Sequence, residues 1–318
     1  MNFRTEISIT PSVNKIDQSQ KILSIGSCFA EEVASCLMKV GVEVVSNPLG
    51  TLYNPMSIAS CVERIVHNRG IQREDLKCRG DVWFSLDSHG SFDNPNPEEV
   101  VSSINRSIEQ AHRALAGVDW VILTLGTSWV FEHNGEVVAN CHKMPAREFV
   151  RRRLSVEEVV ASLERTLAML PDKHVILSIS PVRHLGDGLE GNSLSKATLR
   201  LAAEQLVAQN ERVCYFPSFE ILIDDLRDYR YCGDDMMHPS RGAVEYVWER
   251  FCEMFLGREA LCDGELFERL TDARNHRPLH PESDEHRTFR EAMFRKALTL
   301  THKFPKNPIA SELMKFFA

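Results

Sequence analysis

The sequence lacks the features of several common protein classes. Its nine cysteines include no C-x-x-C pair, which argues against a disulfide framework or a zinc ribbon and fits a reducing cytoplasm. It has no run of the roughly 20 apolar residues that a membrane span needs, and no continuous apolar segment of a secretory signal near its start. Its 37 basic residues are outnumbered by 45 acidic ones, so no basic field favours nucleic acid or an anionic membrane surface. We therefore expect a cytoplasmic protein without nucleic-acid or membrane partners.

Cofactor motifs are also missing. No Gly-x-Gly-x-x-Gly follows the first apolar run, which weakens any nucleotide- or flavin-binding interpretation. Cys141-His142 and the Asp234, Asp235 and His238 group can be drawn as metal ligands, but neither has an established ligand spacing. We expect neither a cofactor nor a metal.

What is present is a regular alternation of short apolar runs and amphipathic segments, in a chain of 318 residues that is 43% hydrophobic. This alternation is typical of an α/β fold with a mainly parallel sheet whose strands are covered on both faces. The predicted strands are Lys21 to Ile25, Val42 to Ser46, Trp120 to Leu125, His174 to Ser180 and Arg212 to Phe216.

Other segments predict helices and two insertions. Ser155 and Glu158 form a capping box at the start of a helix that runs to Leu170, and another helix follows Pro239. Residues 55 to 118 form an insert with a helix near 56 to 67, a hairpin around 82 to 92 and a helix near 98 to 115. Asn134-Gly135 predicts a second hairpin within residues 129 to 140. We expect a main domain over residues 1–257 and a helical extension over 258–318 that packs on it, with a separate C-terminal lobe as the alternative.

The stretch KILSIGSCFAEEV, residues 21 to 33, places two nucleophilic side chains side by side. An apolar strand, a tight turn and an amphipathic helix put Ser27 and Cys28 at a helix N-terminus, at the carboxyl end of a strand. Ligands of open α/β sheets bind outside such ends, and a helix N-terminus can lower the pKa of a thiol. The structural alternative is that Ser27 caps the helix and Cys28 is a small buried residue.

A second segment, YRYCGDDMMHPSRG, carries Asp235 and His238 just before a helix. An aspartate three residues before a histidine on a loop can hold one imidazole nitrogen and leave the other as a general base. Arg183 and His184 follow another strand and His89 lies in an insert loop, so these three are candidate substrate-binding residues. For Arg183, an Arg–Asp ion network that braces the loops is an equal alternative.

Taken together, these motifs resemble a known family. GSCFA at residues 26 to 30 is the signature of the GSCFA-domain proteins, which are placed in the SGNH/GDSL-type hydrolase superfamily. The resemblance continues through NPLGTLYNP (47 to 55), TLGTSW (124 to 129), SPVRH (180 to 184), NSLSKA (192 to 197) and LRDYRYCGDDMMHPS (226 to 240).

The resemblance implies a three-layer α/β/α sandwich around a five-stranded parallel sheet in the flavodoxin-like order. It also implies a nucleophile after the first strand, the Asp235 and His238 pair, and oxyanion donors from the backbone N–H of Gly50 and from position 128. Ser128 stands where the superfamily has asparagine, so its shorter side chain weakens that second donor.

Laid on the superfamily block Gly-Asp-Ser-Leu, the register pairs Cys28 with the nucleophilic serine, while Ser27 takes its place only after a shift of one residue. We expect an acyl-ester hydrolase or acyltransferase that works through an acyl-enzyme on an acylated carbohydrate or small metabolite. The alternative is a non-catalytic relative that uses the pocket to bind a small molecule or glycan.

Overall fold

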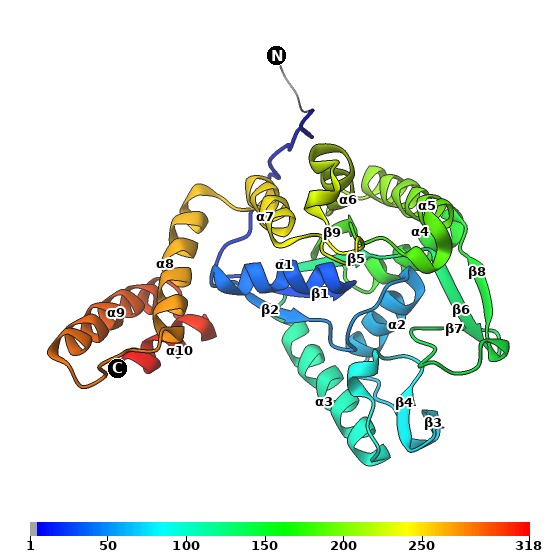
Figure 1. Ribbon diagram of the computed structural model, residues 1–318, viewed down its shortest axis with the longest axis horizontal. Coiled ribbons are helices and arrows are strands. Elements are labelled where there is room, and N and C mark those ends of the chain that lie inside the picture. The colour runs from blue at the N-terminus through cyan, green and yellow to red at the C-terminus, as the bar shows by residue number, and fades with distance from the viewer. Residues whose placement is uncertain (1–4) are drawn as a thin grey trace. The chain divides into compact units, whose positions relative to one another are not determined.

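The computed structural model describes residues 5–318, and its largest sheet has five strands (Figure 1). The strands lie in the order β10-β9-β5-β1-β2. Their bounds are Lys21–Gly26 for β1, Glu43–Ser46 for β2, Trp120–Leu125 for β5, His174–Ile179 for β9 and Val213–Phe216 for β10. β5 pairs with β9 and β9 with β10 in parallel register. The predicted fold class is confirmed, and every strand end lies within one residue of its prediction.

Helices cover the sheet because its strands are apolar on both sides. All six residues of β5 are buried, which requires packing on both faces. One face shares a core with four helices, namely α2 (Pro55–Val66), α3 (Pro97–Leu115), α4 (Val156–Ala168) and α5 (Gly188–Gln209). The predicted capping box starts α4, where the Ser155 hydroxyl accepts from Glu158 N at 3.2 Å and Glu158 Oε2 accepts from Ser155 N at 2.8 Å.

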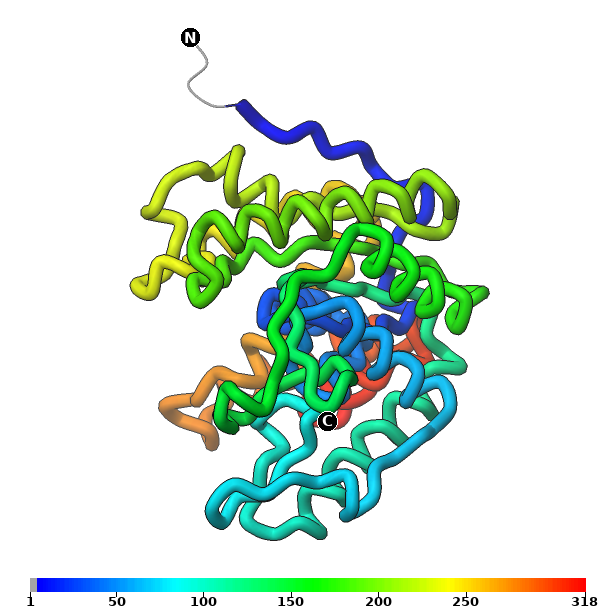
Figure 2. The backbone as a smooth tube through the Cα atoms, turned by 90° about the vertical axis from the view of Figure 1, so that its right-hand side faces the viewer, coloured from blue at the N-terminus to red at the C-terminus, as the bar shows by residue number. Residues whose placement is uncertain are grey.

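The insert is organised differently from its prediction. The hairpin consists of β3 (Leu76–Arg79) and β4 (Val82–Ser85), so it begins six residues before the predicted Val82. The turn lies at Gly80, whose φ of +65° suits glycine. The residues after β4 form a turn, a bend and a short 3-10 helix (Gly90–Phe92) instead of a return strand. The hairpin, cyan in Figure 2, lies far from α5, with α2 and α4 between them.

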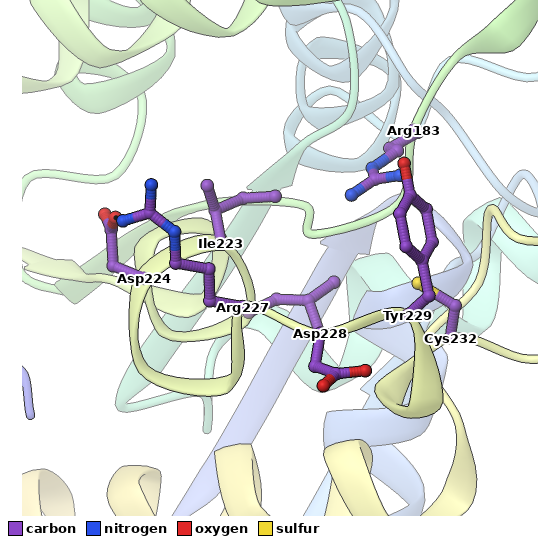
Figure 3. A pocket seen from close by; sticks show the side chains of 8 residues that line it. Arg183, Ile223, Asp224, Arg227, Asp228, Tyr229 and Cys232 are labelled. Atoms are coloured by element: carbon purple, nitrogen blue, oxygen red, sulfur yellow. Dashed lines mark ion pairs between the residues drawn. The ribbon is translucent and has the colours of Figure 1, made fainter. Parts of the chain in front are cut away.

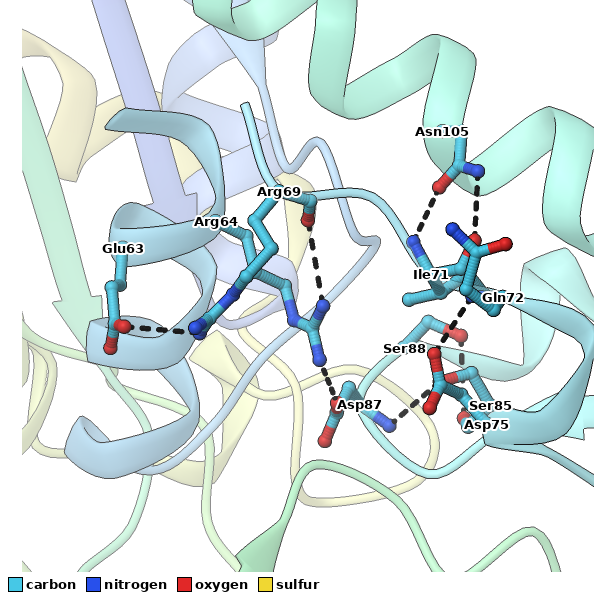
Figure 4. A network of polar contacts seen from close by, with 10 residues as sticks. All are labelled: Glu63, Arg64, Arg69, Ile71, Gln72, Asp75, Ser85, Asp87, Ser88 and Asn105. Atoms are coloured by element: carbon cyan, nitrogen blue, oxygen red, sulfur yellow. Dashed lines mark hydrogen bonds and ion pairs between the residues drawn. The ribbon is translucent and has the colours of Figure 1, made fainter. Parts of the chain in front are cut away.

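Polar side chains connect the segments of the insert (Figure 4). Asn105 on α3 accepts from Ile71 N at 2.7 Å and donates to Ile71 O at 3.0 Å, so one amide satisfies both backbone groups of a loop residue. Arg64 on α2 contacts Asp87 at 2.5 Å. These contacts hold the loops on either side of the hairpin to helices α2 and α3.

The second hairpin is confirmed. β6 (Trp129–His133) pairs with β7 (Glu136–Val138), and φ is positive at both Asn134 (53°) and Gly135 (84°), as a type I′ turn requires. A third strand, β8 (Val150–Arg153), pairs with β6 and was not predicted, because VRRR shows no alternation of apolar and polar residues.

The chain divides into two compact units. Of the described residues, the larger comprises 5–7, 23–32 and 45–247. It also contains the short α6 (Ser218–Glu220), a π-helix (Ile221–Leu226) and the start of α7 (Arg241–Phe255). The smaller comprises residues 8–22, 33–44 and 248–318. The boundary at residue 257 and the packing of the extension on the main domain stay predictions.

The smaller unit has a core of its own, built by α8 (Arg258–Asn275), α9 (Asp284–Lys303) and α10 (Pro308–Phe317). Asn307 joins its segments: Nδ2 donates to Gln18 O and to Gly41 O, both at 2.7 Å, and Oδ1 caps α10 at Ala310 N. Among residues 5–318, no helix is both long and apolar enough to cross a membrane.

Candidate active site

The turn after β1 is fixed by a close approach to β5. A Cβ on Gly26 would lie 2.2 Å from the backbone oxygen of Thr124, so only glycine fits there. Ser27 N donates to the same oxygen at 3.1 Å. Cys28 then begins α1 (Cys28–Lys39), as the sequence predicts.

The two neighbouring nucleophiles differ sharply in exposure. Ser27 is 1% exposed, and its hydroxyl has no hydrogen-bond partner within the described residues. The alternative in which Ser27 caps α1 is therefore wrong. Cys28 is half-buried, and all nine cysteines are free thiols.

Cys28 lines a small cleft of about 50 Å³ in the larger unit. The cleft brings together the first turns of α1, the segment after β9 and the loop that leads into α7. Its lining residues are Cys28, Phe29, Glu32, Val182, His238, Pro239 and Val244. Two predicted catalytic residues from distant parts of the sequence thus meet in one cleft.

His238 is oriented by Asp235, as its spacing predicts. Oδ2 of Asp235 lies 2.6 Å from Nδ1 of His238, and Oδ1 accepts from the backbone N–H groups of His238 (3.0 Å) and Met237 (2.9 Å). These hydrogen bonds, the one from the His238 ring first, lower the pKa of Asp235 to about 2. The carboxylate is therefore ionised at neutral pH and accepts the Nδ1 proton, which leaves the lone pair of a neutral ring on Nε2. The side chains are 41% and 50% exposed, so the pair is open to solvent.

The thiol of Cys28 does not have the depressed pKa that a helix N-terminus suggests. Burial raises the pKa, and the carboxylates of Glu31 and Glu32 raise it further, whereas hydrogen bonds from the N–H groups of Phe29 and Cys28 lower it. The net direction is upward, so the thiol is protonated at neutral pH. A base has to remove its proton before the sulfur can attack.

The predicted oxyanion role of Gly50 conflicts with its hydrogen bonding. Its N–H donates to Asn47 O at 2.8 Å and closes a turn, so it is not available to a substrate oxygen. Asn47 holds this turn against the nucleophile segment, because Oδ1 accepts from Gly26 N at 2.8 Å and Nδ2 donates to Glu31 at 3.0 Å. Gly50 instead allows a close approach: a Cβ there would lie 2.4 Å from Cβ of His89.

Two other candidates also lie outside the lining of the cleft. His89 packs on the turn, where its N–H donates to Leu49 O at 2.9 Å and its Nδ1 accepts from Ser91 N. Ser128 has no exposed surface; its N–H donates to Ser195 Oγ at 2.7 Å, and its own hydroxyl has no hydrogen-bond partner in the described chain. Neither side chain contacts the space beside Cys28.

His184 lies closer to the reacting groups, together with Tyr53, which the sequence did not single out. The two rings meet edge to face with centroids 5.5 Å apart. Burial, with the positive charges of Lys196, Arg151 and His238, lowers the pKa of His184 to about 4, so this ring is neutral at pH 7. Burial raises the pKa of Tyr53, and the negative charge of a Cys28 thiolate raises it further. Both rings are therefore uncharged at neutral pH, and Tyr53 lies close enough to Cys28 for a thiolate there to act on its pKa.

Lys196 is the other residue that the sequence analysis missed as a site residue. It is 2% exposed, and its ammonium donates to Gly126 O and Ser180 O, both at 2.7 Å, at the carboxyl ends of β5 and β9. Burial lowers its pKa to about 7, while a thiolate at Cys28 raises it. A lysine is rarely buried without a carboxylate, so composition offers no signal for such a position.

Arg183 lines a different space from Val182, the preceding residue, which lines the cleft. It lines a second cavity, and its guanidinium lies 5.4 Å from the ring centre of Tyr229. Within residues 5–318 it pairs with no carboxylate, so the alternative of an Arg–Asp network does not hold for Arg183. The described residues also contain no group of three or more His, Cys, Asp or Glu that could hold a metal ion.

Comparison with known proteins identifies the family of the chain. No curated protein matches the chain. A family 3 carbohydrate esterase from Clostridium thermocellum is similar in structure at 11% identity and a TM-score of 0.35, over 74% of this chain and 94% of the esterase. A carbohydrate esterase family 3 structure from Talaromyces cellulolyticus is similar at 11% identity and a TM-score of 0.32, over 73% and 94%. Residues 21–251 match the GSCFA family and residues 267–317 match the C-terminal domain of GSCFA domain proteins, so the chain belongs to the GSCFA family.

Proposed function

We propose that the protein is an acyl-transferring enzyme, a hydrolase or an acyltransferase, in which Cys28 is the nucleophile and His238 the general base. The observation that carries the proposal is the shared cleft: the thiol and the imidazole line the same small space, and Asp235 fixes the imidazole at 2.6 Å. A nucleophile beside a base that a third group orients is the arrangement that acyl transfer requires.

The reaction proceeds in two halves. Nε2 of His238 takes the proton of Cys28, and the sulfur attacks the acyl carbon to form a tetrahedral intermediate. The alkoxide of the substrate leaves with the proton from His238, and a thioester remains on Cys28. Water or an acceptor hydroxyl then gives its proton to His238 and attacks the thioester, and that proton returns to the sulfur as the product leaves.

Exposure favours Cys28 over Ser27. A nucleophile has to contact the acyl carbon, and Ser27 is 1% exposed while Cys28 lines the cleft. Ser27 instead contributes its backbone N–H to the bond with Thr124 that fixes the turn.

We assign the oxyanion donors to backbone N–H groups at the start of α1. The first N–H groups of a helix have no acceptor within it, and those of Cys28 and Phe29 already lower the pKa of the thiol by donating toward the sulfur. The same N–H groups are the donors we assign to the oxygen of the tetrahedral intermediate, in place of Gly50. One such donor is typically worth about 3 kcal/mol of transition-state stabilisation.

The substrate class we assign is an acyl ester of a carbohydrate or small metabolite. The cleft is small, and a volume of about 50 Å³ suits a short acyl group such as acetyl. Whether water or a second hydroxyl accepts the acyl group decides between hydrolase and acyltransferase.

Hydrolysis of 4-nitrophenyl acetate tests the proposal. We expect Cys28→Ala and His238→Ala to lower kcat/KM by about 100-fold or more, because each removes a group that acts on the proton or the acyl carbon. Cys78→Ala, which removes an exposed cysteine of the insert hairpin, is the matched control and keeps the wild-type rate. Activity that survives Cys28→Ala refutes the thiol as nucleophile, and a wild-type protein inactive on every ester tested favours a binding protein.

A further inference from the structure

A second cavity, of about 270 Å³, lies next to the Asp235 and His238 loop in the larger unit (Figure 3). The two spaces share a wall. Val182 lines the cleft and Arg183 the cavity, and Arg183 N donates to Met237 O at 3.3 Å. Cys232 of the cavity forms a β-bridge with Pro239 of the cleft. A substrate held in the cleft therefore has the cavity as the adjacent space for its remaining part.

The charges around the cavity leave one cation without a partner. Asp224 lies 3.9 Å from Arg227, and Asp228 accepts from the backbone N–H of Arg230 at 3.0 Å and lies 3.5 Å from its side chain. Arg183 is half-buried and pairs with no carboxylate in the described chain. A guanidinium carries up to five donors in a planar fork that matches carboxylate and phosphate oxygens.

An aromatic ring holds this cation in place. Tyr229 is 63% exposed, and the guanidinium of Arg183 lies over its ring, on the opposite side of the view in Figure 3 from Asp224 and Arg227. Stacking orients a guanidinium and leaves the N–H groups at its edge available to a ligand.

The opposite wall has unusual backbone geometry. The π-helix Ile221–Leu226 ends at Arg227, which has a φ of +31° although it is not a glycine. π-helical turns and positive φ values at non-glycine residues cost free energy and are concentrated at functional sites. This geometry brings Arg227 and Asp228 into the lining of the cavity.

We propose that this cavity binds an anionic group, a phosphate or a carboxylate, on the substrate of the neighbouring cleft, with Arg183 as its main partner. That the ligand is a substrate rests on the proposed function, whereas binding of the anion itself does not depend on catalysis. It narrows the substrate class to acyl esters whose alcohol portion is acidic, such as a sugar phosphate or a sugar acid.

Binding to the Cys28→Ala variant tests the cavity without turnover. Calorimetric titration measures the affinity for three sugars that share one ring: glucose 6-phosphate carries a phosphate, glucuronate carries a carboxylate, and glucose is uncharged. We expect at least one of the two anions to bind about tenfold or more tightly than glucose, and Arg183→Gln to abolish that advantage. Arg183→Lys retains part of it, because the charge stays but the fork is lost. Arg113→Gln, an exposed arginine on α3, is the matched control.

Equal binding of all three sugars, or an anion advantage that survives Arg183→Gln, overturns the proposal. Whichever acid binds more tightly identifies the group as phosphate or carboxylate. Rates on 4-acetoxybenzoate and 4-nitrophenyl acetate separate this inference from the proposed function. If the subsite acts in catalysis, Arg183→Gln raises KM for the anionic ester more than for the neutral ester, whereas Arg113→Gln changes neither. If the wild-type protein hydrolyses neither ester but still selects the anion, the acyl-transfer proposal fails and the binding site stands.

Discussion

Replacing Lys196 by methionine changes how the stability of the protein depends on pH. The ammonium is 2% exposed and has two carbonyl acceptors, but no ion pair with any described residue. Burial lowers its pKa from 10.5 to about 7, because the charged form loses its hydration. Methionine has a similar length and no proton to lose, so Lys196→Met isolates this titration.

The sign and size of the effect follow from proton linkage. Between about pH 7 and 10 the unfolded chain keeps the proton on Lys196 and the folded chain has released it. The unfolded state then binds more protons, so the free energy of unfolding rises with pH by about 1.4 kcal/mol per unit. From about pH 6.5 to 8.5 this amounts to about 2 kcal/mol. Below this window both states are protonated and the contribution is constant.

Urea denaturation followed by the fluorescence of the four tryptophans measures this slope. We expect wild type to gain about 2 kcal/mol relative to Lys196→Met across that interval. Buried thiols such as Cys61 and Cys214, whose pKa values rise to about 12, favour the unfolded state only above about pH 9, and they do so in both proteins. If the two stability curves run parallel with pH, Lys196 does not have a lowered pKa and the reasoning fails.

Three further predictions concern the site itself. Asp235→Asn keeps the shape of the side chain but removes the charge that holds the Nδ1 proton of His238, so we expect kcat to fall by about 10²- to 10⁴-fold. The melting temperature changes little, because the pair is exposed. An unchanged kcat contradicts the orienting role of Asp235. Gly26→Ala places a Cβ 2.2 Å from the backbone oxygen of Thr124, which cannot move aside, so calorimetry should record a free energy of unfolding that is lower by about 3 kcal/mol or more. A melting temperature equal to that of wild type contradicts the close approach. Burial raises the pKa of Cys28, so the rate of its alkylation by iodoacetamide should still increase with pH above pH 9. Peptide mass spectrometry measures this rate at Cys28. A rate that levels off below about pH 8 indicates a stabilised thiolate and contradicts the raised pKa.

The sheet was predictable because each of its strands carries its own signal. An apolar run such as WVILTL is buried on both faces wherever it lies, so its position follows from the sequence alone. The same holds for Asp235 and His238, whose contact spans three residues of one loop. β8 and the first strand of the insert hairpin escaped prediction, because VRRR and LKCR are largely polar and exposed and contain no apolar run.

The chemistry of the site depended on contacts between distant segments. The pKa of Cys28 is decided by how deeply the fold buries the thiol, and this outweighs the helix terminus that the local sequence suggests. Gly50 occurs at the position that the family resemblance indicated, but the turn closed by Asn47 uses its N–H. The carbonyl groups that accept from Lys196, those of Gly126 and Ser180, lie 70 and 16 residues before it in the sequence, at the ends of two different strands.

The identity of the acylated residue tests the central claim most directly. The wild-type protein is mixed with 4-nitrophenyl acetate, quenched in acid within the first turnover and digested, and the peptide that contains both Ser27 and Cys28 is fragmented. We predict one acetyl group on the sulfur of Cys28, released by neutral hydroxylamine as a thioester is, and absent from Cys28→Ala. An acetyl group on Ser27, stable to neutral hydroxylamine and retained in Cys28→Ala, contradicts the account.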